Sequence, residues 1–446
     1  MIIVKRDGTE VPYDLERIST AIAGAFEDVG NDEFDDLFVL DVIEQMIKDS
    51  KKDKISVEEI QDMVEIALME SGYVDEAKAY ILYRYEHELA RRQQQEKAVE
   101  EKLLASNVQN QNANVDEYSF GGRKGEADNV VMKQFALDNL VSKMARDNHL
   151  NNEIYIHDLD SYAVGMHNCL SIPFDDLLAN GFNTRQTDVR PANSVNTAMQ
   201  LVAVIFQLQS LQQFGGVAAT HLDWTMVPYV RKSFIKHYIE AVEDIADAWI
   251  YSKSNNAKKY DELSSELQKM MDEKNNFTYQ LRLLSKTDKV KDISITDENY
   301  YPNKYFNERE VALERLIKEV HQAVEGMYHN LNTLQSRSGN QLPFTSINYG
   351  TCTLPEGRMV TKALLEVSIE GLGKLHKTSI FPCGIFQCMK NINRKPGDPN
   401  YDLFQLALKS TAQRLYPNYA NVDWSNNAGY DINDPRTYFS TMGLVA

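Results

Sequence analysis

A break in pattern beginning near residue 93 constrains the fold most, because it separates two parts that must each build a core. Residues 93–128 pass from a charged helical pattern into Asn/Gln-rich and then Gly-rich sequence with little apolar periodicity. This segment predicts a linker followed by a surface loop. The 446 residues then divide into an N-terminal unit, 1–92, and a larger part, 129–446, which is long enough for a core of its own.

The N-terminal unit predicts two short strands and four helices. "MIIV" and "EVPY" predict strands joined by the turn "KRDG", and Asp14 is placed to cap the first helix. A second helix is expected over 36–48. Ser56 and Glu59 form a capping-box pattern before a third helix that Gly72 ends, and "DEAKAYILYRYEHELARR" predicts a fourth. A compact, mainly helical domain follows from this pattern.

Beyond residue 128 the chain alternates helical patterns with short apolar runs. "SIFPCGIFQC" and "TSINYGTCTL" are too short for helices and carry β-branched residues or glycine, so buried strands are one expectation for them. "NSVNTAMQLVAVIFQLQSLQQFGG" is apolar almost all round and predicts a helix buried in a core or a subunit interface. Residues 251–310 are polar, as in exposed helices or an insertion. The alternation indicates an α/β fold.

Charge and hydropathy argue against two classes of partner. Lys and Arg total 47 against 65 Asp and Glu, a net charge of −18, which repels nucleic acid and membrane surfaces and confines any phosphate site to a local pocket. No apolar run approaches the roughly 20 residues needed to cross a bilayer, and the N-terminus lacks the pattern of a secretory signal. We expect a cytoplasmic protein that binds neither nucleic acid nor membrane.

The cysteines are too few and too scattered for a disulfide framework, and no CxxC pair predicts a zinc site. They are Cys169, Cys352, Cys383 and Cys388. Cys383 and Cys388 either pack in a buried strand, or Pro382 and Gly384 shape a tight loop that presents Cys383. Their odd separation places them on opposite faces of a regular strand, so they do not predict a dithiol.

"MHNCLSIP" sets Cys169 directly after His167 and Asn168. A structural thiol is one interpretation of this motif. If the thiol lies in a cleft, it can instead give up a hydrogen atom or a proton, and His167 can lower its pKa.

The N-terminal unit resembles the ATP-cone, a regulatory domain at the N-terminus of many ribonucleotide reductases and of their transcriptional repressor. "VKRDGTEVPYDLERISTAI", "ISVEEIQDMVEIALMESG" and "AKAYILYRYEHELAR" carry the resemblance. It implies that the domain senses ATP against dATP. It also implies nucleotide contacts at Val4, Lys5, Arg6 and Arg84, although "VKRDG" alone is more typical of a charged hairpin tip. Arg17 stands where the family usually has lysine, which keeps the charge but changes its geometry.

The larger part resembles the anaerobic, glycyl-radical ribonucleoside-triphosphate reductases. The matching motifs run in order from about Asp116 to Gly443 and include "YIHDLD", "MHNCLSIP", "NSVNTAMQ", "SRSGNQLPFTSINYGT", "KTSIFPCGIFQCMKNINRKPGDPNYDLF" and "DPRTYFSTMG". The resemblance implies an α/β barrel of ten strands in two antiparallel five-stranded halves, here incomplete at its C-terminus. It also implies a finger loop that threads the barrel.

That family reduces ribonucleoside triphosphates to deoxyribonucleoside triphosphates with a thiyl radical that takes the 3′ hydrogen of the ribose. The resemblance implies Cys383 as the radical thiol, with Cys388 as the fallback, and Cys169 as a thiol that helps to reduce the intermediate. Formate is the implied external reductant, and a radical-SAM activase is the implied partner. Substrate contacts are expected at His167, Asn168, Ser440, Thr441 and Gly443.

Two departures from the family stand out. Cys352 occupies a position where relatives commonly carry an acidic or other polar residue, so it is a tolerated core change or an additional thiol. After "STMG" the family continues into a glycyl-radical region with a zinc site of four cysteines, whereas these residues hold neither. We therefore expect no metal, and a chain that is inert alone and needs a C-terminal glycyl-radical part in trans.

Three explanations fit the early end: a split enzyme, an interrupted gene, or a deliberate fragment. An enzyme that forms a homodimer or higher oligomer is the leading hypothesis. One alternative is a catalytically inert module that only binds nucleotides and dimerises. The other is a plain α/β protein whose cysteines are all structural.

Overall fold

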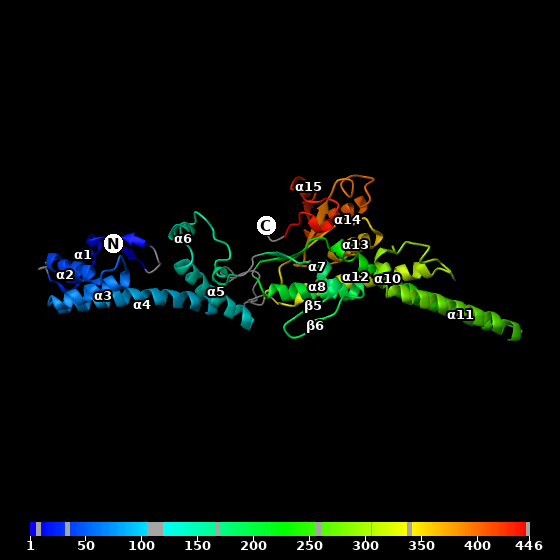
Figure 1. Ribbon diagram of the computed structural model, residues 1–446, viewed down its shortest axis with the longest axis horizontal. Coiled ribbons are helices and arrows are strands. Elements are labelled where there is room, and N and C mark those ends of the chain that lie inside the picture. The colour runs from blue at the N-terminus through cyan, green and yellow to red at the C-terminus, as the bar shows by residue number, and fades with distance from the viewer. Residues whose placement is uncertain are drawn as a thin grey trace. The chain divides into compact units, whose positions relative to one another are not determined.

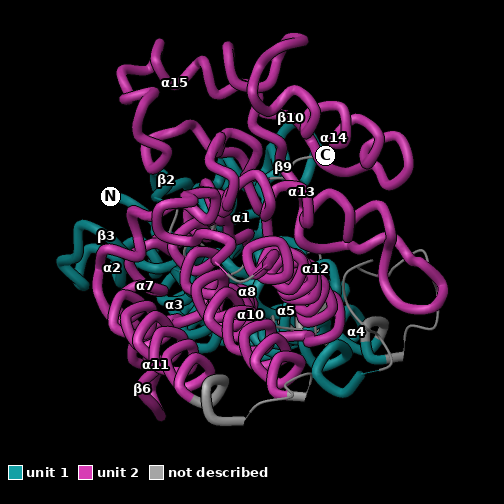
Figure 2. The backbone as a smooth tube through the Cα atoms, turned by 90° about the vertical axis from the view of Figure 1, so that its right-hand side faces the viewer, with its two compact units in different colours: residues 1–166 teal, residues 167–446 magenta. Residues whose placement is uncertain are grey.

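The computed structural model describes residues 1–446 except 6–9, 32–35, 105–118, 166–168, 214, 256–259, 305, 337–340 and 443–446. The chain forms two compact units, residues 1–166 and 167–446 (Figure 2). The division expected from the sequence is 1–92, a linker over 93–128, and 129–446, whereas in the structure residues 93–166 group with the first unit. No helix in the described part of the chain is both long enough and apolar enough to cross a bilayer.

Unit 1 begins with a small three-stranded sheet in the order β2-β1-β3. Strand β1 pairs antiparallel with β2 and parallel with β3. The bounds are β1 Ile2–Val4, β2 Glu10–Pro12 and β3 Lys54–Ser56. The two strands expected from "MIIV" and "EVPY" are thus confirmed, and β3 is an addition that the sequence analysis did not predict.

Four helices pack against this sheet around an apolar core that includes Ile22, Phe26, Ile43 and Leu68. The helices are α1 Leu15–Val29, α2 Asp36–Ser50, α3 Val57–Glu70 and α4 Val74–Leu104. Asp14 accepts a hydrogen bond from the N–H of Glu16 at 3.1 Å, and Ser56 and Glu59 exchange both bonds of a capping box. These predicted caps are confirmed.

The predicted linker is shorter than expected. Helix α4 continues to Leu104, because the Gln, Glu, Lys and Ala residues of this stretch are good helix formers and none is a breaker. Helix α5, Phe120–Asn139, begins inside the expected Gly-rich loop, where Ser119 caps it by accepting a bond from the N–H of Gly122 at 3.0 Å. Helix α6, Lys143–Leu150, follows.

Unit 2 is built on a parallel five-stranded sheet in the order β10-β9-β8-β7-β4. The strands are β4 Leu170–Ser171, β7 Val217–Ala219, β8 Thr345–Tyr349, β9 Cys383–Cys388 and β10 Asn418–Asn421. A separate hairpin joins β5 Phe182–Asn183 to β6 Asp188–Val189. The α/β class and the buried strands β8 and β9 are confirmed, whereas a closed ten-stranded barrel stays a prediction.

Long helices bury the apolar face of this unit, and α8, α10 and α12 pack together around residues such as Val202, Phe206, Phe234 and Leu316. Helix α8 is the predicted apolar helix. Helix α11 packs along α10 and extends outward from the rest of its unit (Figure 1). The longer helices are α7 Phe174–Asn180, α8 Val195–Ser210, α10 Val227–Asn255, α11 Tyr260–Ser285, α12 Glu308–Thr333, α13 Pro355–Glu370 and α14 Tyr401–Arg414. Single-turn helices are α9 Leu222–Thr225, α15 Trp424–Asn427 and two 3-10 segments, η3 Asp288–Asp292 and η4 Pro435–Thr437.

His237 couples α10 to α12. Its ring nitrogens lie 2.7 Å from a Glu319 carboxylate oxygen and 3.2 Å from one of Glu240. The hydrogen bond with Glu319 raises the pKa of His237 above its ordinary value, although partial burial opposes the change. Protonated His237 therefore stabilises the contact between the two helices.

A histidine whose pKa rises on folding contributes stability that is complete below the unfolded pKa of about 6.5 and is lost as pH rises through the folded pKa. We expect the calorimetric unfolding temperature of unit 2 to fall between about pH 6 and pH 9. His237→Gln should flatten that fall. His329→Gln is the control, because its ring is half-exposed and lies 3.6 Å from Glu325. Equal pH profiles for wild type and His237→Gln would contradict the prediction.

Candidate active site

Cys169 and Cys383, the two thiols expected to act on the same substrate, lie at different strands of the parallel sheet. Cys169 directly precedes β4, and Cys383 is the first residue of β9. Pairing registers place Cys383 beside Ser346, Ser346 beside Ala218, and Ala218 beside Ser171. Cys383 is therefore three strand spacings, roughly 14 Å, from β4. The two thiols therefore lie at strands that are separated by β7 and β8.

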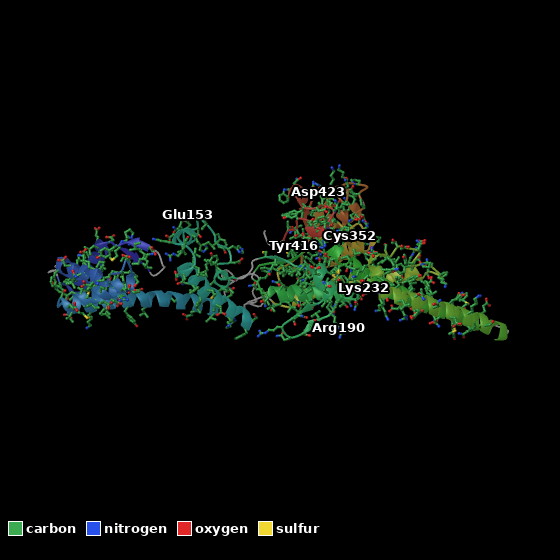
Figure 3. The ribbon with its side chains drawn as sticks, in the orientation of Figure 1. Glu153, Arg190, Lys232, Cys352, Tyr416 and Asp423 are labelled. Atoms are coloured by element: carbon green, nitrogen blue, oxygen red, sulfur yellow. The ribbon has the colours of Figure 1, made fainter. Side chains whose placement is uncertain are left out.

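Cys383 lies in the apolar core, with a side chain that is 3% exposed. Its thiol donates to the Tyr416 hydroxyl at 3.5 Å (Tyr416 is labelled in Figure 3), and burial raises the pKa of Cys383, so the sulfur keeps its proton. Of the two structures expected for this segment, a buried strand and a tight loop that presents Cys383, the structure has the strand. Gly384 serves close packing, because a Cβ there would lie 2.9 Å from the Tyr349 hydroxyl.

Cys169 is the exposed cysteine, and Cys388 is half-buried at the far end of β9. The N–H of Gly216, which precedes β7, points to the Cys169 sulfur at 3.4 Å. His167 and Asn168, the expected neighbours of Cys169 in the site, lie outside the described residues. Cys169 is thus the thiol that a ligand can reach most directly.

Cys352 is a core residue. It is fully buried, and a Cβ at Gly357 of α13 would lie 2.2 Å from its sulfur. Burial raises the pKa of Cys352 far above its ordinary value, and the charge of Asp223 adds to the effect. Its N–H donates to Asp223 at 2.9 Å. The structure thus gives the Cys352 thiol a packing role. Of the two interpretations, this favours a tolerated core change over an additional functional thiol.

Two buried amide side chains, Asn348 and Gln387, bind backbone carbonyls near the C-terminal ends of the strands. The Asn348 side-chain amide on β8 donates to the carbonyl of Ala219 at 3.0 Å and to that of Thr441 at 3.2 Å. Gln387 on β9 donates to Thr220 at 3.1 Å. Both amides are fully buried, and their carbonyl oxygens have no partner among the described residues. The sequence analysis missed Asn348 and Gln387, whose only signal is a polar letter inside an apolar strand.

The "STMG" segment touches this end of the sheet through Thr441, whose backbone carbonyl accepts the bond from Asn348. Thr441 is one of the expected substrate contacts. Ser440 lies one residue before Thr441, and Gly443 lies outside the described residues. In parallel α/β sheets, ligands bind beyond the C-terminal ends of the strands. The position of Thr441 fits that rule.

A second constellation that the sequence analysis missed follows β7. The His221 ring bonds the Thr220 hydroxyl at 2.6 Å and the Asp175 carboxylate at 2.9 Å, and Thr225 donates to the other Asp175 oxygen at 2.6 Å. Burial would raise the pKa of Asp175, but the hydrogen bonds from His221 and Thr225 lower it, so it stays ionised. Asp175, His221 and Thr225 line a cavity of about 380 Å³.

Unit 1 has its own cavity, of about 480 Å³, beside its three-stranded sheet. Lys5 and Arg17 supply positive charge at its wall, where Arg17 also pairs with the lining residue Asp14 at 3.3 Å, and Ile3, Ile18 and Ile60 supply an apolar surface. Positive charge beside an apolar wall suits a ligand with a phosphate end and a flat ring. Lys5 is the predicted contact that lines this cavity, Val4 lies next to it in β1, and Arg6 is outside the described residues.

Arg84 has a different role in this conformation. Its guanidinium lies 2.7 Å from Asp62, 2.8 Å from Glu65 and 3.5 Å from Glu58. All three carboxylates belong to α3, so Arg84 ties α4 to α3 and is not among the residues that line the cavity. Its predicted contact with a nucleotide stays a prediction. Within the part of the chain that the structure describes, no group of acidic, cysteine or histidine side chains could hold a metal ion.

Two family models match the chain. "Anaerobic ribonucleoside-triphosphate reductase" matches residues 111–443, and "ATP cone domain" matches residues 1–89. The anaerobic ribonucleoside-triphosphate reductase of Haemophilus influenzae is 29% identical over 94% of this chain and 52% of its own length. The enzyme of the same name from Escherichia coli is 28% identical over 99% of this chain and 57% of its own length.

The chain thus spans about half the length of the curated relatives it matches. Among solved structures, the anaerobic ribonucleotide reductase of Thermotoga maritima in complex with dATP and CTP aligns with a TM-score of 0.41. The alignment has 13% identity and covers 68% of this chain and 43% of that one.

The contact between Cys352 and Gly357 yields a test of the packing role. Gly357→Ala should destabilise unit 2 by about 1–3 kcal/mol, because the new methyl overlaps a buried sulfur. Gly326→Ala on α12 is the matched control: its Cβ would meet nothing within 4 Å, so it should stabilise by about 0.5–1 kcal/mol. Chemical denaturation of both variants decides, and equal effects at the two glycines would exclude the tight packing described.

Proposed function

The chain belongs to the anaerobic ribonucleoside-triphosphate reductase family, and from that premise we propose that it reduces ribonucleoside triphosphates to deoxyribonucleoside triphosphates. The observation that carries the proposal is the family match over residues 111–443, which include all four thiols. With formate as reductant the reaction balances as nucleotide, formate and a proton giving deoxynucleotide, carbon dioxide and water. ATP and dATP would regulate it through residues 1–89.

Sulfur suits the first step because a neutral S–H bond and a sugar C–H bond have similar strengths. We propose Cys383 as the thiol that becomes the radical and takes the 3′ hydrogen, since its burial keeps it protonated and shielded from oxidants. Cys169 is proposed as the thiol that helps to reduce the sugar after the 2′ hydroxyl leaves as water. A glycyl radical, installed by a radical-SAM activase, would start the cycle from the same polypeptide or in trans.

The two proposed thiols differ in how accessible they are to a substrate. Cys169 is exposed at the edge of the sheet, whereas Cys383 is in the core and roughly 14 Å from β4 by strand spacing. Catalysis through both thiols would require the two sulfur atoms to reach the same ribose. Cys388, at the other end of β9, is the competing radical thiol.

The thiol assignment is tested by deoxynucleotide formation under anaerobic conditions. The chain is mixed with a glycyl-radical segment of a relative, the activase, formate and CTP. We expect Cys169→Ser and Cys383→Ser each to abolish product, because neither hydroxyl can replace the thiol's hydrogen-atom chemistry. Cys352→Ser should retain product, because that thiol only packs.

Turnover that survives Cys383→Ser and is lost in Cys388→Ser would move the radical thiol to Cys388. Unfolding temperatures of all four variants separate loss of chemistry from loss of fold. If no deoxynucleotide forms with any thiol intact, while ATP and dATP still bind, the module that only binds nucleotides becomes the better description.

We propose the unit 1 cavity as the site for ATP and dATP. The base would rest on the apolar wall, and Lys5 and Arg17 would face the phosphates. Calorimetric titration of the full chain with ATP should show at least tenfold weaker binding in Lys5→Gln. Lys78→Gln, an exposed change on α4 away from the cavity, should leave affinity unchanged. Equal affinities in the two variants would place the effector elsewhere.

A further inference from the structure

Thr220, His221 and Asp175 form a continuous chain of hydrogen bonds at the C-terminal end of β7. The Thr220 hydroxyl lies 2.6 Å from Nδ1 of His221, and Nε2 of the same ring lies 2.9 Å from a carboxylate oxygen of Asp175. A hydroxyl beside an imidazole that a carboxylate orients is the arrangement that activates an oxygen nucleophile in proteins. The proposed thiol chemistry uses none of these three groups.

The charge of Asp175 decides in which direction these hydrogen bonds run. Burial would raise its pKa, but hydrogen bonds from His221 and Thr225 lower it, so the carboxylate stays ionised. A carboxylate only accepts hydrogen bonds, so Nε2 of His221 carries the ring proton. In the neutral ring Nδ1 is then the acceptor, and the Thr220 hydroxyl donates to it. The Thr220 oxygen is therefore already hydrogen-bonded to a base.

Two further carboxylates lie close enough to His221 for its charge to lower their pKa values, and both are engaged elsewhere. Asp223 accepts hydrogen bonds from backbone N–H groups, and Asp434 pairs with Arg436 at 2.7 Å. Asp175 is thus the group that orients the imidazole.

Neighbouring side chains fix both ends of the chain of hydrogen bonds. Gln387 on β9 donates to the Thr220 carbonyl at 3.1 Å, which holds the backbone of the hydroxyl-bearing residue. Thr225 donates to the second oxygen of Asp175 at 2.6 Å and to the carbonyl of His221 at 3.2 Å. Because a small displacement of reacting groups is costly in rate, such fixed geometry favours chemistry at the hydroxyl.

The base and its orienting carboxylate face a cavity. His221 and Asp175 line the cavity of about 380 Å³, whose volume is within the range of small-molecule sites, and Thr220 is half-buried beside it in sequence. Trp224 and Tyr229 give the cavity an apolar aromatic wall. An apolar wall beside an oxygen nucleophile suits a small uncharged electrophile that carries an apolar group.

Lys232 supplies positive charge to the same cavity (Lys232 is labelled in Figure 3). Its ammonium donates to the Ala192 carbonyl at 3.0 Å. Burial, and next the charge of Lys291, lower the pKa of Lys232, while Asp288, which pairs with Lys291 at 2.8 Å, opposes the change. A half-buried ammonium is a group that stabilises negative charge on a carbonyl oxygen under attack.

We propose that Thr220 is a nucleophile that hydrolyses small carboxylic esters, as an activity separate from nucleotide reduction. Its oxygen bonds to the carbonyl carbon, its proton passes to Nδ1 of His221, and the alcohol leaves with that proton as the ester C–O bond breaks. Water then attacks the acyl-threonine, His221 takes a proton from the water, and the threonine oxygen leaves with it. The sum is ester and water giving carboxylic acid and alcohol, with no oxidant or reductant. Asp175 acts as a positioning residue.

The first experiment uses the wild-type full chain and a fluorophosphonate, which bonds to an activated hydroxyl and releases fluoride. Mass spectrometry of the digested protein locates the modified residues. We expect Thr220 to react about 100-fold faster than Thr296, because general-base catalysis contributes at least that factor. Thr296 is the internal control, since its hydroxyl is exposed and lies 3.0 Å from a serine hydroxyl, Ser294, which is not a base. Equal rates would overturn the proposal.

The second experiment follows release of 4-nitrophenolate from 4-nitrophenyl acetate over many equivalents of protein. Thr220→Val and His221→Gln should each slow turnover by about 100-fold, whereas Thr220→Ser should retain it, because serine keeps the hydroxyl. Thr296→Val and His329→Gln are the matched controls and should behave as wild type. Turnover that survives Thr220→Val would overturn the proposal.

Neither experiment needs a thiol, a radical or a nucleotide, so failure here is distinct from failure of the proposed reductase activity. Unfolding temperatures of the variants separate loss of chemistry from loss of fold, and the labelling of the wild-type chain decides even if a variant does not fold. Labelling of Thr220 without turnover of the ester would overturn the hydrolytic activity. A chain of hydrogen bonds that only ties α7 to β7 predicts neither labelling nor turnover.

Discussion

Three buried polar side chains hold the C-terminal edge of the parallel sheet, and both candidate sites of unit 2 depend on them. Asp223 accepts N–H bonds from Gly350 and Cys352 at 2.9 Å. Asn393 donates to the carbonyls of Gly350 and Gln387, and Asn400 donates to those of Gly350 and Cys352. Together these bonds satisfy backbone groups that would otherwise be buried without a partner, at a cost of about 1–3 kcal/mol for each unsatisfied group. The ends of β8 and β9 are thereby fixed, and with them the surface on which Thr441 and His221 rest.

The contacts at this edge also explain why unit 2 tolerates polar side chains inside its buried strands. Asn348 and Gln387 bring amides into an interior that favours apolar residues, yet each uses its N–H groups to bind the carbonyls that end β7. Their carbonyl oxygens are buried and have no hydrogen-bond partner among the described residues. The opposite face packs against α8, α10 and α12 and is apolar.

Local patterns predicted local structure well. Asp14 and the pair Ser56 and Glu59 cap the helices where the sequence placed them, because a cap is decided within four residues. The linker expected from residue 93 begins later in the structure, because residues with high helix propensity extend α4 to Leu104. What the sequence could not supply was register: only the pairing of β9 with β8, and of β8 with β7, shows how far Cys383 is from β4. The His221 and Asp175 pair was missed for the same reason, because 46 residues separate them along the chain.

The graded burial of the cysteines has a consequence for handling the protein in air. Cys352 and Cys383 are enclosed, Cys388 is half covered, and Cys169 faces solvent. Oxidants attack accessible sulfur first, and the early products at such a site are sulfenic acid and mixed disulfides, which reductants reverse. Damage by oxygen should therefore begin at the edge of β4 while the sheet stays intact, so that a sample can keep its fold and its unfolding profile after losing a thiol proposed for the chemistry.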